Sequence, residues 1–411
     1  MRKNRAALCP DRRGAGIRDR AFSRKLISWY KTHHRKLPWR EGADPYRTWI
    51  SEIMLQQTTV RAVIPYYERW TGLFPDVGAL ARAPLQKVLR AWQGLGYYQR
   101  ARNLHRSARI LVRDHSGRIP DDEKTLGGLP GFGPYTTAAV LSLAYGRPLP
   151  VVDANVRRVL MRIMNLRGAA SARQDRAIRA YLKGVLPLRE PGLFNQAMME
   201  LGALVCRSRN PQCLLCPVQD ACLAARKGTQ EVIPRPRTRT TRKVAAAVAV
   251  IEDRGRYLIQ RRPSTGLLAG LWEFPGGKIQ RCERPEAALR REVREELGVR
   301  VQRVRFLTTV KHAYTEYEVT LHVFTCRLEG RGPDMRPDRR WVSLRSIRRY
   351  PLPSGSVKIV DVLAAREAKS PPSKIARRGL TGAGQGKPIS LCFRATDSAR
   401  LSRARKSDSL G

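Results

Sequence analysis

The stretch from residue 129 to residue 160 constrains the fold of this chain more than any other. It reads LPGFGPYTTAAVLSLAYGRPLPVVDANVRRVL. Gly131 and Gly133 stand where a backbone turns tightly or approaches a neighbour closely, and helix-compatible residues follow from Tyr135. Backbone amides at a helix start, with the positive end of the helix dipole, bind anions. We therefore predict a turn between two helices whose amides can bind a phosphate.

Asp153 lies twenty residues beyond Gly133 and precedes a segment with helical apolar spacing, residues 154–160. An Asp at this place is most often only an N-cap, and a glycine turn by itself occurs between many pairs of helices. Both of these ordinary interpretations stay open at this point. The order of turn, helix and aspartate is more specific than either feature alone.

The charge of the chain points to a polyanionic partner. Its 411 residues include 79 Lys and Arg against 34 Asp and Glu, which gives a formal net charge of +45. Phosphates supply most of the affinity when proteins bind nucleic acid without sequence preference. Arg-rich ends and genome composition are an ordinary explanation for part of this charge. The length allows two or three domains.

No targeting or membrane segment is recognisable. The longest apolar run, Val244 to Ile251, is too short to span a membrane, and the N-terminus lacks the apolar core of a secretory signal. We expect a monomeric, cytoplasmic protein of bacterial type, associated with the nucleoid and with no membrane partner.

Periodicity and composition divide the chain into five segments. Helical spacing recurs to about residue 228, and strand-like alternation begins at residue 244 after a Pro- and Arg-rich stretch. The predicted segments are a basic disordered arm (1–20), an all-α domain (21–228), a linker (229–243), an α/β module (244–365) and a disordered basic tail (366–411). Expected helices of the all-α domain cover residues 22–30, 46–59, 60–71, 84–92, 98–114, 135–145, 155–165, 174–186 and 193–205. In the module we expect strands at 244–251, 256–260, 299–310 and 316–328 and a helix at 285–297.

Four of the eight cysteines crowd together near the end of the all-α domain. Cys206, Cys213, Cys216 and Cys222 have six, two and five residues between them. Thiolates at this density are typical of a closed zinc site or of an iron–sulfur cluster. Short-range zinc sites usually contain two C-x-x-C pairs, which this spacing lacks, so it favours the cluster.

Glu52 is a second acid with unusual neighbours, in the segment WISEIMLQQT. The apolar side chains around it predict a partly desolvated carboxyl with a raised pKa. The ordinary alternative is an exposed charge near a helix start. A protonated acid is what cleavage of a purine glycosidic bond requires, because adenine is a poor leaving group until it is protonated.

These segments together resemble the adenine DNA glycosylases, which belong to the helix-hairpin-helix and endonuclease III superfamily. The LPGFGP turn, the VDANV segment, the SEIMLQQT helix and the cysteine spacing each match a motif of that family. The resemblance implies that Glu52 protonates adenine and that Asp153 stabilises or captures the oxocarbenium-like sugar. It also implies that Asn155 orients Asp153, that Tyr135 packs at the sugar, and that the loop 206–222 holds a structural [4Fe–4S] cluster.

The resemblance extends to the way in which DNA is held. Relatives with lyase activity have a catalytic Lys at or near the position of Tyr135, and a tyrosine cannot form a Schiff base. Gln56, Gln57 and Tyr97 match residues that fill the space left by a flipped base, although aromatic packing is an ordinary alternative for the tyrosine. We also expect a phosphate-facing stripe at helical spacing, made of Arg100, Arg102, Arg106 and Arg109.

In the α/β module, Gly277 and Glu283 precede the run REVREELGV, residues 291–299. This pattern resembles a complete Nudix box, as found in MutT-type nucleotide pyrophosphohydrolases. Its three glutamates share one helix face and could bind Mg²⁺, and a salt-bridged surface helix is the alternative; they are Glu292, Glu295 and Glu296. The resemblance implies that the module recognises 8-oxoguanine opposite the adenine through Tyr314 and Thr315, with Glu316 in place of the family's His.

We therefore expect an all-α helix-hairpin-helix glycosylase domain with a [4Fe–4S] loop, followed by a Nudix-like α/β domain. The expected activity is that of a monofunctional DNA glycosylase in base excision repair. It would hydrolyse the N-glycosidic bond of adenine mispaired with 8-oxoguanine or guanine in duplex DNA. Two alternatives remain. One is pyrophosphohydrolase activity on 8-oxo-dGTP, additional or sole, and the other is a non-catalytic protein that binds damaged DNA.

Overall fold

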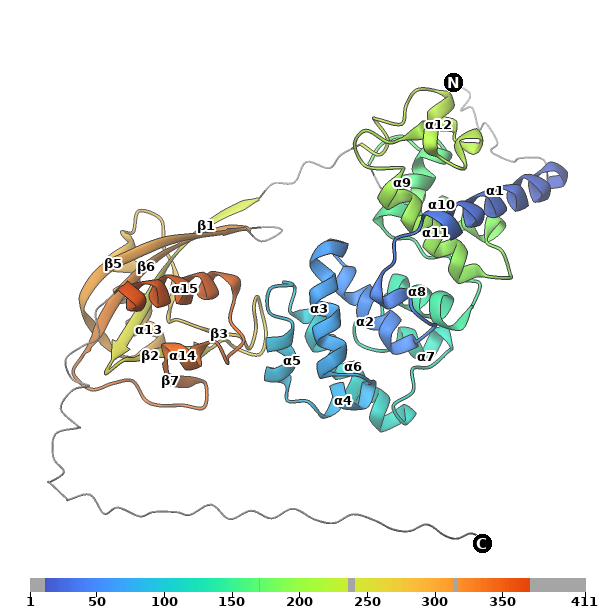
Figure 1. Ribbon diagram of the computed structural model, residues 1–411. Helices are drawn as coiled ribbons and strands as arrows, with labels where there is room; N and C mark the ends of the chain where they lie inside the picture. Colours follow the sequence, from blue (N-terminus) through green and yellow to red (C-terminus); the bar gives the residue numbers. More distant parts are fainter. Residues whose placement is uncertain (1–11, 170, 236–240, 314–316, 370–411) are drawn as a thin grey trace, which may run out of the picture. The chain divides into compact units, whose positions relative to one another are not determined.

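The computed structural model describes residues 12–169, 171–235, 241–313 and 317–369 (Figure 1). The described residues up to 364 form one compact unit. The expected fold class is confirmed, since a helical region comes first and an α/β region with a seven-stranded sheet follows. Within the described residues, no helix is long and apolar enough to cross a membrane.

The helices from α2 to α8 pack around a first hydrophobic core. These are α2 (Pro45–Leu55), α3 (Val60–Leu73), α4 (Val77–Arg82), α5 (Leu85–Ala91), α6 (Gln99–His115), α7 (Glu123–Gly127) and α8 (Pro134–Tyr145), preceded by the 3-10 helix η1 (Pro38–Arg40). Trp49, Trp70 and Trp92 are buried at its centre, and the rings of Trp70 and Trp92 meet edge to face at 5.4 Å. Large aromatic side chains give such a core most of its apolar burial.

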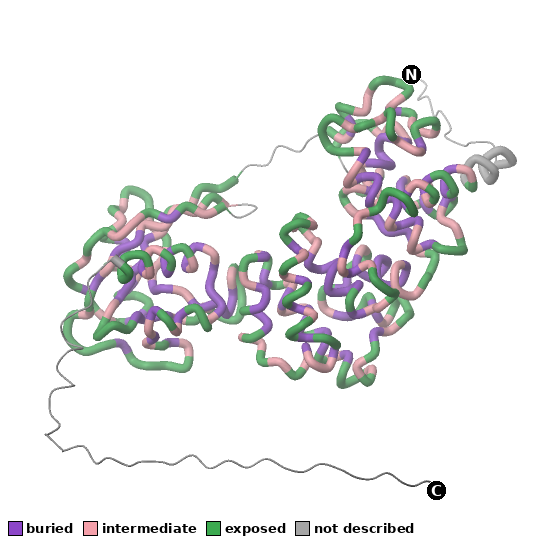
Figure 2. Tube along the Cα trace, in the orientation of Figure 1, coloured by how far each residue is buried: buried purple, intermediate pink, exposed green. Residues whose placement is uncertain are grey.

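A second helical core joins the start of the described chain to helices far along the sequence. Helix α1 (Arg12–His33) packs against α10 (Ala172–Val185) and α11 (Pro191–Leu204), and α9 (Ala154–Ile163) belongs to the same core. The cysteine loop follows with η2 (Cys213–Leu215), η3 (Gln219–Ala221) and α12 (Leu223–Arg226). Helix α1 begins at Arg12, within the segment expected to be a basic arm. Figure 2 shows that the helices of both cores have buried and exposed sides.

The turn between α7 and α8 is fixed by its neighbours. Gly131 has φ +85°, and a Cβ there would lie 2.9 Å from Cβ of Asn103, so glycine is required on both grounds. Phe132 stacks on Trp49 of α2 at 5.1 Å. Gly133 has φ −77° and open space where a Cβ would sit, so neither its backbone angle nor a contact within the described residues requires glycine there.

The α/β region is one sheet with helices on both faces. Its elements are β1 (Arg242–Asp253), β2 (Arg256–Arg261), β3 (Trp272–Glu273), β4 (Gly276–Lys278), α13 (Pro285–Leu297), β5 (Arg300–Ala313), β6 (Tyr317–Glu329), β7 (Arg339–Ser343), α14 (Leu344–Ile347) and α15 (Ser354–Lys369). The strand order is β3-β2-β1-β6-β5, with β4 on β1 and β7 on β2, and β1 runs parallel to β6.

Side chains that alternate between the two faces of β1 explain why helices cover both faces of the sheet. Ala247, Ala249 and Ile251 belong to one core cluster with Val293 and other apolar residues of α13. Val248 and Val250 belong to the opposite cluster, which α14 and α15 complete. Successive strand residues point to opposite faces of a sheet, so an unbroken apolar run is what a strand covered on both sides requires.

Candidate active site

A cavity of about 820 Å³ lies where the two helical cores meet. Its walls come from residues 35–61, from Tyr135 and residues 152–157, and from one side of α11. The cavity brings together six of the residues singled out in the sequence, namely Glu52, Gln56, Gln57, Tyr135, Asp153 and Asn155. Segments far apart in the chain therefore share one site.

Glu52 lies on α2 among the apolar residues that its sequence context indicated. It is 4% exposed, and Trp49, Ile50, Ile53 and Met54 around it are buried. The hydroxyl of Tyr135 on α8 donates to Oε2 of Glu52 at 2.5 Å. Burial raises the pKa of Glu52 to about 7, although the Tyr135 hydrogen bond opposes the rise. A carboxyl of this kind holds a proton near neutral pH and can deliver it.

Asp153 is both an N-cap and a wall of the cavity. Its Oδ1 accepts from the Val156 amide of α9 at 2.6 Å, and its Oδ2 accepts from Nδ2 of Asn155 at 3.0 Å. Arg158 in turn donates to Oδ1 of Asn155 at 2.9 Å. Burial raises the pKa of Asp153, and the two donated hydrogen bonds oppose this. The ordinary cap interpretation is therefore true, and the same contacts fix the carboxylate in the cavity.

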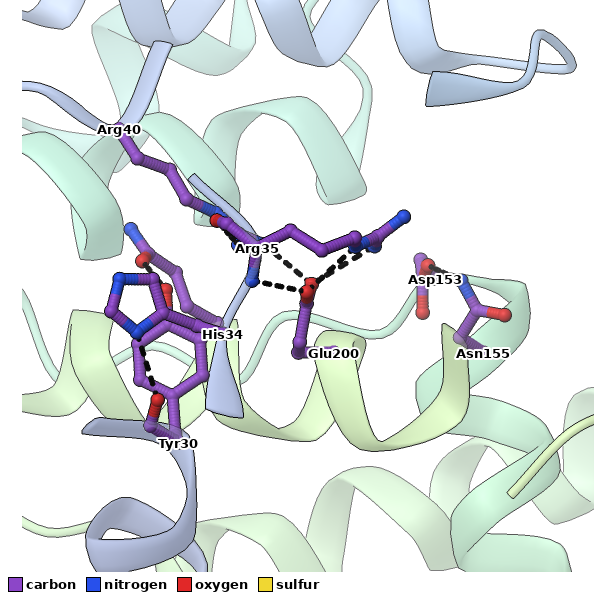
Figure 3. Close-up of polar contacts among 8 residues, drawn as sticks. Tyr30, His34, Arg35, Arg40, Asp153, Asn155 and Glu200 are labelled. Atoms are coloured by element: carbon purple, nitrogen blue, oxygen red, sulfur yellow. Dashed lines mark hydrogen bonds and ion pairs between the residues drawn. The ribbon is translucent and has the colours of Figure 1, made fainter. Parts of the chain in front are cut away.

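Three charged residues of the cavity escaped the sequence analysis. Glu200 of α11 is 1% exposed, and its Oε1 accepts from the backbone amide of Arg35 at 3.0 Å and from Nε at 2.7 Å (Figure 3). Its Oε2 accepts from Nη2 of Arg35 at 3.0 Å and from Nη2 of Arg40 at 2.8 Å. These hydrogen bonds outweigh burial and hold the pKa of Glu200 at about 2. Glu200 is the only charged residue in the sequence of α11, and this was the signal that could have found it.

The cavity therefore contains carboxyls in different states of protonation. Glu52 keeps its proton to near neutral pH, whereas Glu200 is ionised beside two guanidinium groups. Separate environments for neighbouring acids are how one site provides both a proton donor and a charge that stabilises a cation. Asp153 lines the same cavity, and its carboxylate is oriented by the hydrogen bonds that Asn155 and Val156 donate to it.

The residues expected to fill a flipped-base gap lie in two places. Gln56 donates to Oγ1 of Thr136 at 3.2 Å, and Gln57 is exposed at the rim with φ +59°. Tyr97 is 43% exposed with φ +48°, and it lines a separate cavity of about 450 Å³. Positive φ is costly for side chains of this size, and such strain concentrates at functional positions.

The expected phosphate-facing stripe on α6 was wrong at its first two positions. The guanidinium of Arg100 is turned inward. It donates to the carbonyls of Ile53, Met54 and Gln56 at 2.8, 3.1 and 2.6 Å, and so closes the C-terminal end of α2. Burial lowers its pKa to about 10. Arg102 donates to the carbonyl of Ala269, whereas Arg106 and Arg109 are exposed.

The four cysteines of the loop are free, partly buried thiols. The thiols lie close enough to influence one another, because Cys206, Cys213 and Cys222 all raise the pKa of Cys216, after the larger effect of burial. Across the described ranges, no group of three or more His, Cys, Asp or Glu side chains is arranged to hold a single metal ion. The guanidinium of Arg162 is 1% exposed and donates to Sγ of Cys206 at 3.2 Å. Four soft donors beside a buried cation fit an anionic iron–sulfur centre in chemistry and number.

The Nudix-box glutamates are engaged by protein partners. Arg291 donates to Glu283, Glu292 and Glu295 at 2.8, 2.8 and 3.1 Å. Glu296 accepts from Nε2 of Gln260 at 2.6 Å. The salt-bridged helix is thus present, and the expected Mg²⁺ site finds no support among the described side chains. Tyr314, Thr315 and Glu316 lie outside the described residues.

Comparisons with known proteins cover both regions. Residues 50–186 match the HhH-GPD superfamily of base excision DNA repair proteins, and residues 246–362 match the NUDIX domain. An adenine DNA glycosylase of Homo sapiens is 34% identical over an alignment of 384 residues, which covers 79% of this chain and 70% of the relative. One of Mycobacterium tuberculosis is 45% identical over 195 residues, 47% of this chain and 64% of the relative. The structure of a thermostable thymine-DNA glycosylase has 29% identity and a TM-score of 0.47, over 52% of this chain and 99% of that chain.

Proposed function

Because the chain belongs to the adenine DNA glycosylase family, whose members are base excision repair hydrolases acting on N-glycosidic bonds, we propose that it excises adenine mispaired with 8-oxoguanine or guanine. The family and the enzyme class expected from the sequence are confirmed by these relatives. The preference for particular mispairs, the roles of single residues and the monomeric state belong to the proposal.

The single observation that carries the proposal is the placement of two desolvated acids in one cavity. Glu52 delivers its proton to a ring nitrogen of adenine, which makes the base a better leaving group. As the glycosidic bond breaks, the sugar becomes cationic, and the Asp153 carboxylate, oriented by Asn155, stabilises or captures it. Water adds a hydroxyl to the sugar carbon, and its second proton returns to a carboxylate. Tyr135 holds Glu52 and packs at the sugar.

The reaction stops at the abasic site. Schiff-base lyase chemistry needs an amine near the sugar. Of the described residues that line the cavity, none is a lysine. The resemblance implies that relatives with lyase activity carry their lysine at or near the position of Tyr135, whose hydroxyl donates to Glu52 in this chain.

Duplex DNA is the partner that the surroundings of the cavity suit. Gly133 is the N-cap of α8, and the open space beside it leaves room for a phosphate to reach the backbone amides of the turn that contains Gly131. Gln56, Gln57 and Tyr97 fill the gap left by the flipped nucleotide.

In the proposed function, the α/β region recognises the base that stands opposite adenine. We assign the reading of the base opposite adenine to Tyr314 and Thr315, on the resemblance of their segment to the family's recognition loop. Sole hydrolysis of 8-oxo-dGTP is not favoured, because the Homo sapiens relative is similar over most of the chain.

We further propose that Cys206, Cys213, Cys216 and Cys222 hold a [4Fe–4S] cluster. When bound, the cluster supplies a rigid centre for the loop. The loop then presents Arg207 and Arg209 to the DNA backbone. Iron and sulfide analysis of the purified protein tests this part independently of catalysis, with Cys282→Ser, an exposed cysteine outside the loop, as the matched control for Cys213→Ser.

The predicted domain boundaries and the cytoplasmic, nucleoid-associated location stay predictions. The proposed activity is tested with four duplexes in which adenine stands opposite 8-oxoguanine, guanine, cytosine or thymine. We expect free adenine from the first two duplexes, and strand breakage only after alkali. Equal release from all four would contradict the proposed preference. Strand breakage without alkali would contradict a monofunctional enzyme.

A further inference from the structure

Helix α11 lies tightly against the two segments that carry the proposed catalytic groups. At Gly192, a Cβ would lie 2.6 Å from the backbone oxygen of Ser142 on α8. At Gly202, a Cβ would lie 2.6 Å from Cβ of Asn155 at the start of α9. Two glycines thus allow α11 to touch the helix of Tyr135 at one end and the neighbour of Asp153 at the other.

Between these glycines, α11 carries Asn195, whose side chain is completely buried. Its Nδ2 donates to Oγ of Ser142 at 2.7 Å and to the carbonyl of Leu149 at 2.8 Å. Its Oδ1 accepts from the amide of Val151 at 3.2 Å. One buried amide therefore joins α11, α8 and the segment that leads to Asp153.

That segment has no regular structure to hold it. Residues 146–153 form neither helix nor strand, although Val151 and Val152 are buried. Buried backbone groups need hydrogen-bond partners, and a neighbouring strand normally supplies them. Here the Asn195 amide pairs with Leu149 and Val151 as a strand would. Val151 lies two residues before Asp153, so this pairing fixes the backbone from which the Asp153 carboxylate enters the cavity.

We propose that Asn195 is a positioning residue for adenine release, and the inference rests on the function proposed above. Asn195 is not among the residues that line the cavity, whereas its neighbour Gln196 is. Asn195 therefore acts through the Leu149–Val151 backbone, by setting where Asp153 stands relative to the sugar. Misplacing a reacting group by about 1 Å costs about 10²-fold in rate.

A role in the fold alone would have a different signature. Partial unfolding lowers the fraction of active molecules, but each folded molecule would still react at the normal rate. Single-turnover kinetics separate the two, because the amplitude of adenine release reports the active fraction and the rate constant reports the geometry. The dissociation constant for a duplex with an unreactive adenosine analogue measures DNA binding separately from the chemical step.

The test uses Asn195→Asp, which keeps the size and the Oδ1 acceptor but cannot donate two hydrogen bonds in either protonation state, and Asn195→Leu, which loses all three hydrogen bonds. Ser142→Ala, which leaves both backbone contacts of Asn195 in place, is the matched control. Leu182→Ala, a buried change in the same core, controls for stability. We expect the rate constant to fall about 10²-fold in Asn195→Leu and by less in Asn195→Asp, with duplex affinity unchanged. Both controls should keep the normal rate constant.

A normal rate constant with reduced amplitude in Asn195→Asp would overturn the inference, as would an equal loss in Leu182→Ala. If Asn195→Leu does not fold, Asn195→Asp decides alone by the same criterion. The unaltered protein separates this result from failure of the proposed function. Release by the unaltered protein with normal Asn195 variants overturns only the positioning role, whereas no release by any of them overturns both.

Discussion

Tyr135 and Glu52, eighty-three residues apart in the chain, share a 2.5 Å hydrogen bond in which the tyrosine hydroxyl donates to the carboxylate. Glu52 is buried and Tyr135 is half-buried, and burial is the largest influence on both pKa values. The contact opposes the effect of burial on Glu52. It therefore holds the pKa of this acid near neutrality, where a proton donor is most useful.

Removing this hydrogen bond should move the pH dependence of the reaction. Tyr135→Phe takes away a donor that favours the ionised carboxylate, so the pKa of Glu52 should rise above about 7. The acid must be protonated to act, so adenine release falls as pH rises through this pKa. We expect the alkaline limb of the single-turnover rate to shift to higher pH. Tyr145→Phe, which loses a hydrogen bond to Ile119 instead, should leave the limb in place.

Glu52 should also make the fold less stable at alkaline pH. Its folded pKa of about 7 lies above the ordinary value of 4.5, so the folded state keeps a proton that the unfolded state releases. The stabilisation is present below pH 4.5 and is lost as pH rises through 7. Glu52→Gln should therefore raise the free energy of unfolding at pH 8 by up to about 3 kcal/mol, with a smaller gain at pH 5. Urea unfolding at both pH values measures this, and an equal effect at both would refute it.

Glu200 should have the opposite effect. Its pKa of about 2 lies below the ordinary value of 4.5, so its stabilisation is present above pH 4.5 and is lost as pH falls towards 2. Glu200→Gln leaves two guanidinium groups without their buried carboxylate and should cost about 3 kcal/mol at pH 7. Glu190→Gln removes the exposed partner of Lys31 and should cost less than about 1 kcal/mol. Similar losses in the two variants would show that the Glu200 cluster is not a buried ion pair.

Gly202→Ala should slow adenine release although alanine favours helices. A new Cβ would lie 2.6 Å from Cβ of Asn155, so the start of α9, and Asp153 with it, must shift. We expect a loss of about 10²-fold in the single-turnover rate constant. Gly184→Ala in α10 meets nothing within 4 Å and should instead gain about 0.5–1 kcal/mol of stability at a normal rate. A normal rate in Gly202→Ala would show that α11 and the start of α9 can accommodate the added methyl group without displacing Asp153.

Local patterns predicted most of the fold. The helix expected at 285–297 has the bounds of α13, and its Val293 and Leu297 are buried. The α-helices and strands that escaped besides α15 have two to six residues each, too few to show a period; they are α4, α7, α12, α14, β3, β4 and β7. Helix α15 was not predicted, although Ile359, Val360 and Leu363 recur at helical spacing and belong to a core cluster of the sheet.

Two members of the candidate site were singled out from their local sequence together with the family resemblance. Glu52 among apolar neighbours, and Asp153 before a helix, are visible in the sequence. Arg100 shows one limit of prediction from sequence. A helical stripe of arginines has the same sequence pattern whether a guanidinium faces phosphate or folds back onto carbonyls. Glu200 shows another, since its partners Arg35 and Arg40 lie 165 and 160 residues away and only the fold brings them together.

The central claim is that Glu52 and Asp153 divide the work of breaking one glycosidic bond, and one measurement tests it most directly. Single-turnover adenine release from a duplex with adenine opposite 8-oxoguanine is followed for the unaltered protein, Glu52→Gln and Asp153→Asn, alongside duplex affinity. We expect release only by the unaltered protein, with duplex affinity nearly intact in both variants. Release by either variant at the normal rate would contradict the claim, and no release by the unaltered protein would favour a protein that only binds damaged DNA.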